Sequence, residues 1–187
     1  IEKTEIPKKH FVPTHMNRNP YLFEKSLEYA SKGGYVDYTT STVPLFIEEG
    51  EVPAYHTLKL LLDKGIDTSV VTFTSDGQGS LPGFDEHGNM SRIDVRKVTS
   101  LYESVKDAIT KDEVDISVAI SVITSNPAKI YGLKAKGNIE QGKDADLVLV
   151  DKSSFEIDTV IAKGQVMIEE KQIKIQCYRC TEWCWCW

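Results

Sequence analysis

The sequence predicts an α/β fold in which parallel strands alternate with helices. Three strands are predicted at 10–14, 35–39 and 70–74, and two helices at 19–33 and 53–64 separate them. An order of strand, helix and strand indicates parallel βαβ units. Each helix runs back along the sheet, so that the next strand starts at the same end as the one before it.

The C-terminal part of the chain has a different pattern, which predicts a small antiparallel β unit. After Gly137 the apolar runs become short and are separated by turn residues. The predicted strands lie at 146–150, 159–162, 165–168 and 172–175. Short strands that follow one another without helices pair most simply as an antiparallel meander.

The functional prediction starts from the predicted strand at 70–74. Its residues, VVTFT, are β-branched or aromatic, which is typical of a buried strand. The strand ends just before Asp76, and Gly77 and Gly79 follow. A carboxylate at the C-terminal end of a parallel strand is a common position for a catalytic acid or base. The alternative is that Asp76 only caps a turn, as Asp before Gly often does.

The first helix and the second have clear boundaries in the sequence. Asn19 is a good N-cap and Pro20 suits the first helical position, while Gly33 and Gly34 stop the helix. The second helix ends at Gly65. Before the first helix, the apolar run at 10–14 leads into His15, and a loop is expected at 40–50.

Beyond the central strand we expect a loop, several helices and then the antiparallel unit. The segment 81–91 is rich in Gly, Pro, Asp and Asn, so we expect a loop that covers the strand end. Apolar residues at helical spacing predict a long helix at 94–110. A further helix at 115–123 and a helical turn at 126–133 complete this part.

Composition restricts the class of protein. The 187 residues are 41% hydrophobic and 27% charged, which is ordinary for a globular protein, and the net charge is −6. The negative charge argues against nucleic acid or an anionic membrane as partner, and no apolar run could span a bilayer. The expected location is the cytoplasm. The chain starts at Ile1 rather than Met, so we expect its natural start to lie upstream.

The last eleven residues differ from everything before them. They contain every cysteine and tryptophan of the chain, at Cys177, Cys180, Trp183, Cys184, Trp185, Cys186 and Trp187. We interpret 176–187 as a tail that is not part of the fold. Four thiolates could bind zinc, but their spacing does not match the common zinc ribbons or fingers.

Several motifs resemble a known superfamily. The segments Thr124–Ala128 and Gly137–Val148, with Gly132-Leu133 between them, are similar to the exit from the barrel in the amidohydrolase superfamily. Within that superfamily, THMNRN at 14–19 and SDGQGS at 75–80 resemble the isoaspartyl (β-aspartyl) dipeptidases. The resemblance runs from about residue 6 to residue 174, which is nearly the whole chain except its tail.

The resemblance implies a (β/α)8 metallo-hydrolase barrel followed by a small β-sandwich, with a binuclear zinc site at the C-terminal mouth of the barrel. A complete barrel needs roughly 250 residues. Residues 1–136 would supply its last βα units, and 137–175 part of the sandwich. The family's early His-x-His motif, its carboxylated lysine and one further histidine are missing. The isolated chain is therefore expected to be inactive and unstable, and the complete enzyme to be a homo-oligomer.

The site residues follow from the same resemblance. His15 matches a zinc ligand, and Asp76 matches an aspartate that contacts metal and serves as general base. Arg18 matches the arginine that pairs with a substrate carboxylate, and Ser80 a serine that contacts substrate. The structural alternatives are a packed histidine, a surface ion pair and a turn serine. We interpret His56 and His87, which match nothing, as surface residues.

These residues imply metal-dependent hydrolysis of the β-aspartyl amide bond in small dipeptides. One alternative is another amidohydrolase activity, as in cyclic-amide hydrolases or D-aminoacylases. A second alternative is a truncated chain without catalytic activity. If the leading prediction holds, His15 and Asp76 lie at the same end of neighbouring parallel strands, and their side chains converge on one open space.

Overall fold

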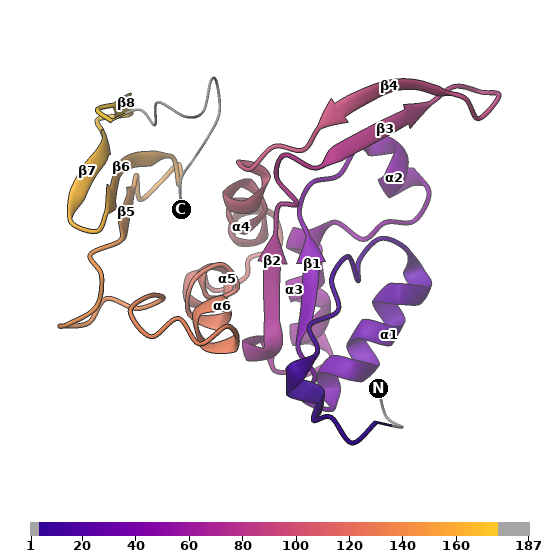
Figure 1. The fold of residues 1–187 in the computed structure, drawn as a ribbon, viewed down its shortest axis with the longest axis horizontal. Coiled ribbons are helices and arrows are strands. Elements are labelled where there is room, and N and C mark those ends of the chain that lie inside the picture. The colour runs from indigo at the N-terminus through magenta and orange to yellow at the C-terminus, as the bar shows by residue number, and fades with distance from the viewer. Residues whose placement is uncertain (1–3, 176–187) are drawn as a thin grey trace.

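The computed structural model describes residues 4–175, so the predicted tail at 176–187 lies outside the described residues. Two parallel strands stand at the centre, with helices packed against one face (Figure 1). A separate four-stranded sheet follows at the C-terminal end. The fold is therefore α/β, as predicted, with parallel strands and helices followed by a small antiparallel unit.

The helices are α1 (Pro20–Ser31), α2 (Pro44–Glu48), α3 (Ala54–Asp63), α4 (Ser100–Lys111), α5 (Ile116–Ser121) and α6 (Ser125–Ile130), and 3-10 turns lie at Lys8–His10 and Thr68–Val70. The strands are β1 (Val36–Thr39), β2 (Val71–Thr74), β3 (Ser80–Phe84), β4 (Met90–Val95), β5 (Leu147–Val150), β6 (Ile157–Ala162), β7 (Gln165–Glu169) and β8 (Gln172–Ile173). In the described residues, no helix is long and apolar enough to cross a membrane.

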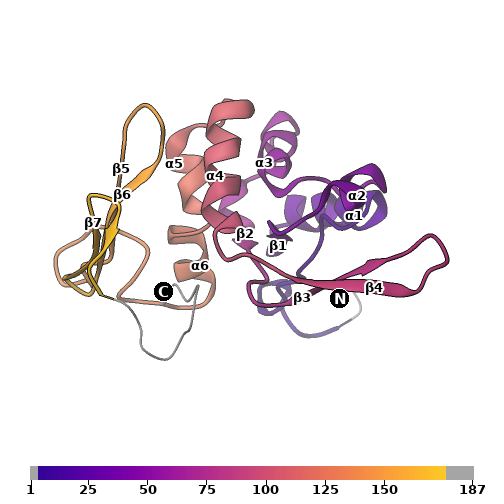
Figure 2. The same cartoon turned by 90° about the horizontal axis from the view of Figure 1, so that it is seen from above.

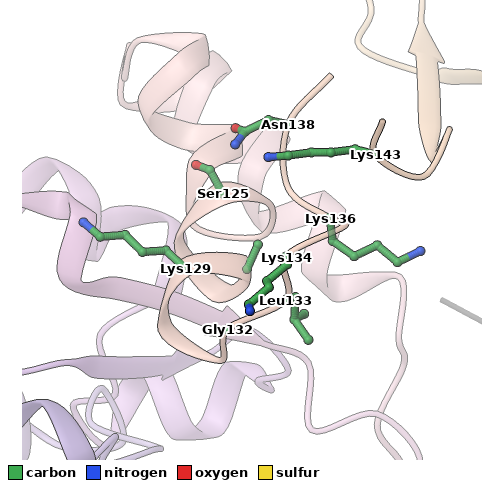
Figure 3. Close-up of a pocket in the computed structure, with 9 residues that line it drawn as sticks. Ser125, Lys129, Gly132, Leu133, Lys134, Lys136, Asn138 and Lys143 are labelled. Carbon is green, nitrogen blue, oxygen red and sulfur yellow. The ribbon is translucent and has the colours of Figure 1, made fainter. Parts of the chain in front are cut away.

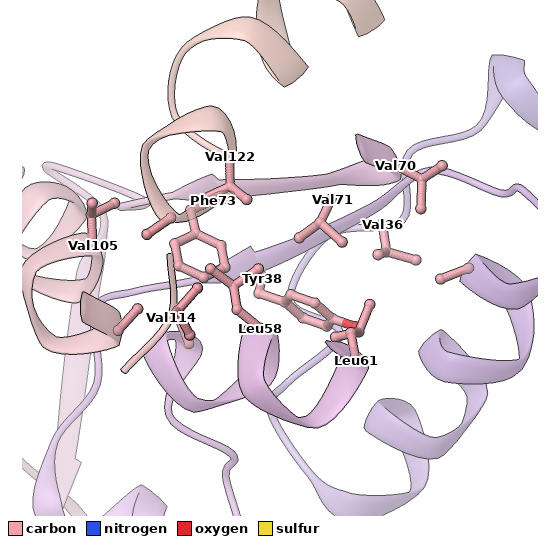
Figure 4. Packing of buried hydrophobic residues seen from close by; sticks show 14 of the residues in the cluster. Val36, Tyr38, Leu58, Leu61, Val70, Val71, Phe73, Val105, Val114 and Val122 are labelled. Carbon is pink, nitrogen blue, oxygen red and sulfur yellow. The ribbon is translucent and has the colours of Figure 1, made fainter. Parts of the chain in front are cut away.

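Strands β1 and β2 divide the molecule into an apolar side and a polar side. They pair in parallel, with Val36 opposite Val71 and Thr39 opposite Thr74. Tyr38 lies on the apolar side, where its ring contacts the rings of Phe23 and Phe73. Burial raises the pKa of Tyr38 to about 12. This apolar face packs against α1 and α3 (Figure 4). These are the helices predicted at 19–33 and 53–64.

The predicted strand at 10–14 is not a regular strand. Its chain is extended and hydrogen-bonded to β1, because the N–H of Asp37 donates to the Pro13 carbonyl and the N–H of Met16 to the Asp37 carbonyl. Pro13 has no N–H to offer a neighbouring strand, and His15 has a left-handed φ of 58°. The segment therefore follows β1 with an irregular, bulged pairing.

The outer edge of β2 has partners within the chain. The N–H of Phe73 donates to the Val122 carbonyl at 3.1 Å. The side-chain amide of Asn126 donates to the carbonyls of Val71 and Thr68, both at 2.9 Å. The segment around α5 and α6 thus covers part of an edge that would otherwise present unpaired backbone groups. The predicted instability of the isolated chain stays a prediction.

The prediction of a loop at 81–91 is wrong. Strands β3 and β4 form an antiparallel hairpin that extends away from the body (Figure 2). Its turn begins at Asp85, whose carboxylate accepts the N–H groups of His87 and Asn89. All of β4 is exposed, so its sequence lacks the alternation of apolar and polar residues that usually indicates a strand.

The helix predicted at 94–110 begins later than expected. Val95 belongs to β4, where it pairs with Ser80, and α4 starts only at Ser100. Helix α2 lies within the predicted loop at 40–50 and begins at Pro44. The helices predicted at 19–33, 53–64, 115–123 and 126–133 are confirmed as α1, α3, α5 and α6, with shorter bounds.

The C-terminal strands form one antiparallel sheet in the order β5-β6-β7-β8. This confirms the predicted antiparallel unit. The sheet is tied to the rest of the chain through α4, because the Tyr102 hydroxyl donates to the Phe155 carbonyl and Lys106 pairs with Glu156. The division of the chain near residue 137 stays a prediction.

Candidate active site at the carboxyl ends of the parallel strands

His15 lies beside the carboxyl end of β1. Its Nδ1 is 2.7 Å from the Oγ1 of Thr39, the last residue of that strand. Its backbone is left-handed, a conformation that costs energy in a residue other than glycine and that is often found at functional sites. With Nδ1 engaged by the hydroxyl, Nε2 is the nitrogen that could bind a metal.

Asp76 lies in a tight turn just beyond the carboxyl end of β2. Its φ is 49°, and the N–H of Gly79 donates to its carbonyl at 3.0 Å. A Cβ at position 79 would lie 2.8 Å from the Asp76 carbonyl oxygen and 3.1 Å from its Oδ1. Gly79 is therefore required so that the turn can close against the carboxylate.

The two residues lie at the same end of the sheet, as predicted, but they do not follow neighbouring strands, because β1 lies between their segments. Because β1 and β2 are parallel and in register, Thr39 and Thr74 end together, and His15 and Asp76 lie beside these ends. Strand β1 lies between the two residues, so they flank it. The predicted convergence of the two side chains on one open space stays a prediction.

A buried carboxylate in β1 joins the two segments that carry His15 and Asp76. Asp37, in β1, is 1% exposed and accepts hydrogen bonds from the hydroxyls of Thr14, Thr72 and Thr74. Thr14 precedes His15, and Thr74 is two residues before Asp76. Burial raises the pKa of Asp37, although the three hydroxyls act in the opposite direction.

The raised pKa of Asp37 predicts a pH dependence of stability. A folded-state pKa above the unfolded value of about 3.9 favours the folded protein at low pH, and this contribution is lost as pH rises through the folded pKa. Relative to Asp37→Asn, the wild type should therefore lose unfolding free energy as pH rises from about 4 toward neutral. Chemical denaturation of both proteins across this range measures it. A difference that does not change with pH would contradict the prediction.

Arg18 lies close to the same end of the sheet and is paired. Its Nη1 is 2.6 Å from Oε2 of Glu51, whose side chain is 1% exposed, so the surface-pair alternative is wrong. The guanidinium also lies 5.9 Å from the ring centre of Phe46, in α2. The segment is held by buried Asn17, which bonds the N–H and the carbonyl of Thr39. The side chain of Arg18 is therefore held in one orientation by these contacts.

Arg96 is a second arginine at this end. Its Nε lies 3.1 Å from Oδ2 of Asp76, and its Nη1 donates to the Ser41 carbonyl at 3.0 Å. Burial lowers the pKa of Arg96, and the positive charge of Arg18 lowers it further, whereas Asp76 and Glu51 oppose this shift. The sequence interpretation missed Arg96, Glu51 and Asp37, since none of them belongs to the motifs at 14–19 and 75–80.

Ser80 and the remaining histidines complete the predicted set. Ser80 is exposed at the start of β3, four residues beyond Asp76. Its contact with substrate stays a prediction. His87 lies exposed in the hairpin, as expected. His56 is partly exposed and pairs through Nδ1 with Asp112 at 2.7 Å.

His15 and Asp76 are chemically suitable zinc ligands, but two residues are too few to form a zinc site. Imidazole nitrogen and carboxylate oxygen are ordinary zinc ligands, and a zinc site needs three or four of them. Among residues 4–175, no group of three or more His, Cys, Asp and Glu side chains could hold a metal ion. His15 and Asp76 would thus supply two ligands, and the others would have to come from outside this part of the chain.

A cavity of about 260 Å³ lies elsewhere, between α6 and the loop that leads to β5 (Figure 3). Several lysines line it, but Lys136 pairs with Asp144 and Asp146, and Lys143 pairs with Glu140. In Figure 3, Lys129 and Lys136 extend away from each other. The cavity therefore does not focus its positive charge on one point.

Residues 40–167 match the sequence profile of the amidohydrolase family. This chain belongs to the amidohydrolase family. The membership agrees with an α/β fold whose candidate residues gather at the carboxyl ends of parallel strands.

Individual relatives differ in activity. The crystal structure of the β-aspartyl dipeptidase from Fervidobacterium islandicum AW-1, in complex with β-Asp-Leu, is 37% identical, with a TM-score of 0.80. The match covers 95% of this chain and 45% of that one. A 5-methylthioadenosine/S-adenosylhomocysteine deaminase from Aquifex aeolicus is 35% identical over 80 residues, which is 33% of this chain and 18% of that protein.

A dihydroorotase from Endomicrobium trichonymphae is 33% identical over 72 residues, covering 34% of this chain and 17% of the dihydroorotase. The chain thus spans less than half the length of each of these three relatives. The match over residues 40–167 shows the family, and the relatives within it act on different substrates.

Proposed function

We propose that this chain is part of a zinc-dependent amidohydrolase that cleaves the β-aspartyl amide bond of dipeptides. The observation that carries the proposal is the similarity to the Fervidobacterium β-aspartyl dipeptidase over 95% of the chain. Half-buried Arg18, which lies near the same strand ends as Asp76 and pairs with buried Glu51, supports it. A β-aspartyl dipeptide keeps two free carboxylates, and a fixed guanidinium suits one of them.

In the proposed reaction, Asp76 moves one proton. A zinc ion bound by His15 and Asp76, together with ligands from outside this chain, would polarise the amide carbonyl and make a water molecule more acidic. Asp76 accepts a proton from the attacking water and delivers it to the leaving nitrogen. The hydroxyl adds to the carbonyl carbon, the carbon–nitrogen bond breaks, and the products are aspartate and a free amino acid.

Arg18 and Glu51 would act as a unit in substrate binding. The Nη1–H of Arg18 donates to Oε2 of Glu51, which fixes the plane of the guanidinium and leaves other N–H groups for a substrate carboxylate. Ser80 would contact substrate from the start of β3. The complete enzyme is proposed to be a cytoplasmic homo-oligomer, and the isolated chain to be inactive.

A cyclic-amide hydrolase is the second candidate, since part of the chain is similar to a dihydroorotase. It explains Arg18 less well, because cyclic amides lack the second carboxylate of a dipeptide. A chain without catalytic activity is the third candidate. It predicts that no zinc binds even when the barrel is completed.

The test uses a completed barrel, defined as the Fervidobacterium enzyme with its matching portion replaced by the whole 187-residue chain. We expect about two zinc ions per chain and hydrolysis of β-Asp-Leu, as measured by metal analysis and release of leucine. The unmodified Fervidobacterium enzyme is the positive control. Hydrolysis of dihydroorotate but not β-Asp-Leu would favour the second candidate, and a folded protein that binds no zinc would favour the third.

The hydrogen bond between Thr39 and His15 leads to a separate prediction. Thr39→Val removes the hydroxyl that engages Nδ1 but keeps the shape of the side chain. Loss of a partner that orients a metal-binding histidine typically lowers metal affinity about 10- to 100-fold. Competition with a chelator measures zinc affinity in the completed barrel. Thr42→Val, at a threonine outside this contact, is the control, and equal affinities for both variants would contradict a ligand role for His15.

A further inference from the structure

In the described residues, the buried polar atoms without partners belong to three charged side chains that lie close enough for Arg18 and Glu51 to shift the pKa of Arg96. In residues 4–175, the buried side-chain nitrogen and oxygen atoms that lack a hydrogen-bond partner are Arg18 Nη2, Glu51 Oε1 and Arg96 Nε. Buried polar groups in folded proteins are nearly always satisfied. Two of these three atoms are guanidinium donors, so the cluster has unused capacity to bind an anion.

Arg96 is held firmly enough to recognise a ligand. Its N–H donates to the Gly79 carbonyl and its carbonyl accepts the N–H of Gln78, both at 3.0 Å. Its Nη1 donates to the carbonyl of Ser41, and its side chain is 11% exposed. Its Nε lies 3.1 Å from the Asp76 carboxylate in an ion pair, but makes no hydrogen bond there. The Nε–H of Arg96 therefore lies close to Asp76, the proposed general base, and is still available to donate a hydrogen bond to a ligand.

The chemistry of the leaving group indicates which anion would bind. Asp76 delivers its proton to the leaving nitrogen, and in a dipeptide that nitrogen is bonded to the carbon that carries the leaving residue's carboxylate. The carboxylate must therefore lie next to the point of proton delivery. The other free carboxylate, on the aspartyl residue, is separated from the scissile carbonyl by two carbons. A guanidinium in contact with Asp76 is thus placed for the leaving residue's carboxylate.

We propose that Arg96, together with Arg18, binds the carboxylate of the amino acid that leaves. This assigns a specificity-determining role to Arg96 and rests on the proposed function. It predicts a preference for substrates whose leaving residue has a free carboxylate, namely dipeptides, over their C-terminal amides and longer peptides. The two guanidiniums share one anion, which offsets their mutual repulsion.

The test compares two substrates in the completed barrel, β-Asp-Leu and its C-terminal amide. Arg96→Met should lower kcat/KM for β-Asp-Leu by about 30-fold, which corresponds to ~2 kcal/mol at 1.36 kcal/mol per factor of ten. The loss for the amide should be far smaller, because the wild type gains nothing from a carboxylate that is absent. Arg96→Lys keeps the charge and should recover part of the activity toward β-Asp-Leu.

Arg92→Met is the matched control, because Arg92 is an exposed arginine in β4, four residues before Arg96, and pairs with Asp94. It should leave both substrates unaffected. Equal losses on both substrates for Arg96→Met would overturn the inference and show that Arg96 only holds the Asp76 turn. Failure of the wild type to cleave either substrate would overturn the proposed function itself.

A binding measurement gives a result that does not depend on turnover. Calorimetric titration with leucine and with leucinamide probes the leaving-residue site of the completed barrel directly. Wild type should bind leucine more tightly than leucinamide, and Arg96→Met should remove most of that difference. An unchanged preference for leucine in Arg96→Met, with unchanged zinc content, would overturn the inference.

Discussion

Asp76→Asn should lower kcat and kcat/KM of the completed barrel together, by at least about 10²-fold, the low end for loss of a general base. Asparagine has the shape of aspartate but cannot take a proton from water at neutral pH. It also tolerates the left-handed backbone at this position better than most residues do. The folded structure should therefore change little while the chemical step slows.

The measurement is steady-state hydrolysis of β-Asp-Leu, with zinc content and thermal unfolding of each variant recorded in parallel. Asp94→Asn is a suitable control, since Asp94 lies exposed in β4 and pairs with Arg92. A kcat of Asp76→Asn within a few-fold of wild type would exclude Asp76 as the base. A loss of activity that is explained by loss of zinc would assign Asp76 to metal binding alone.

Arg18→Met should have the second large effect, on kcat/KM for β-Asp-Leu. The expected loss is roughly 2 to 4 kcal/mol, by analogy with other desolvated charge pairs. For the C-terminal amide the loss should be smaller, because the partner carboxylate is missing. Equal losses on the two substrates would remove Arg18 from recognition and favour a cyclic-amide hydrolase.

The structure adds a stability effect to this variant. Glu51 is 1% exposed and pairs with Arg18, so Arg18→Met leaves a buried carboxylate without its partner. Breaking a buried ion pair from one side typically costs about 3 to 5 kcal/mol of stability. The double variant Arg18→Met/Glu51→Leu removes both charges and should recover much of the stability. It should not recover the preference for β-Asp-Leu over the amide, which separates folding from recognition.

Much of the fold can be read from local sequence patterns. The run at 70–74 and its partner at 35–39 consist largely of β-branched and aromatic residues, and both form strands. Asn19 and Pro20 fix the start of α1, because an N-cap oxygen and a proline ring act on neighbouring residues only. The motifs at 14–19 and 75–80 lie beside strand ends, so their placement at one end of the sheet follows from parallel pairing alone.

The hairpin β3–β4 illustrates where such patterns fail. Its strands are stabilised by pairing with each other, such as Leu81 with Asp94, and its outer strand has no buried face. Without a buried face there is no alternation of apolar residues for the sequence to display. The pairing also ends the apparent helical pattern at Val95, which local spacing had assigned to α4.

The sequence by itself determined the α/β class, the start of α1 and the candidates His15, Arg18 and Asp76, because these depend on short-range pattern and motif. Only the tertiary structure decided what those candidates touch. Glu51 is 33 residues from Arg18 in the chain, and Arg96 is brought to Asp76 by the hairpin between them. Contacts over such separations depend on how the strands and loops pack, and no local propensity encodes them.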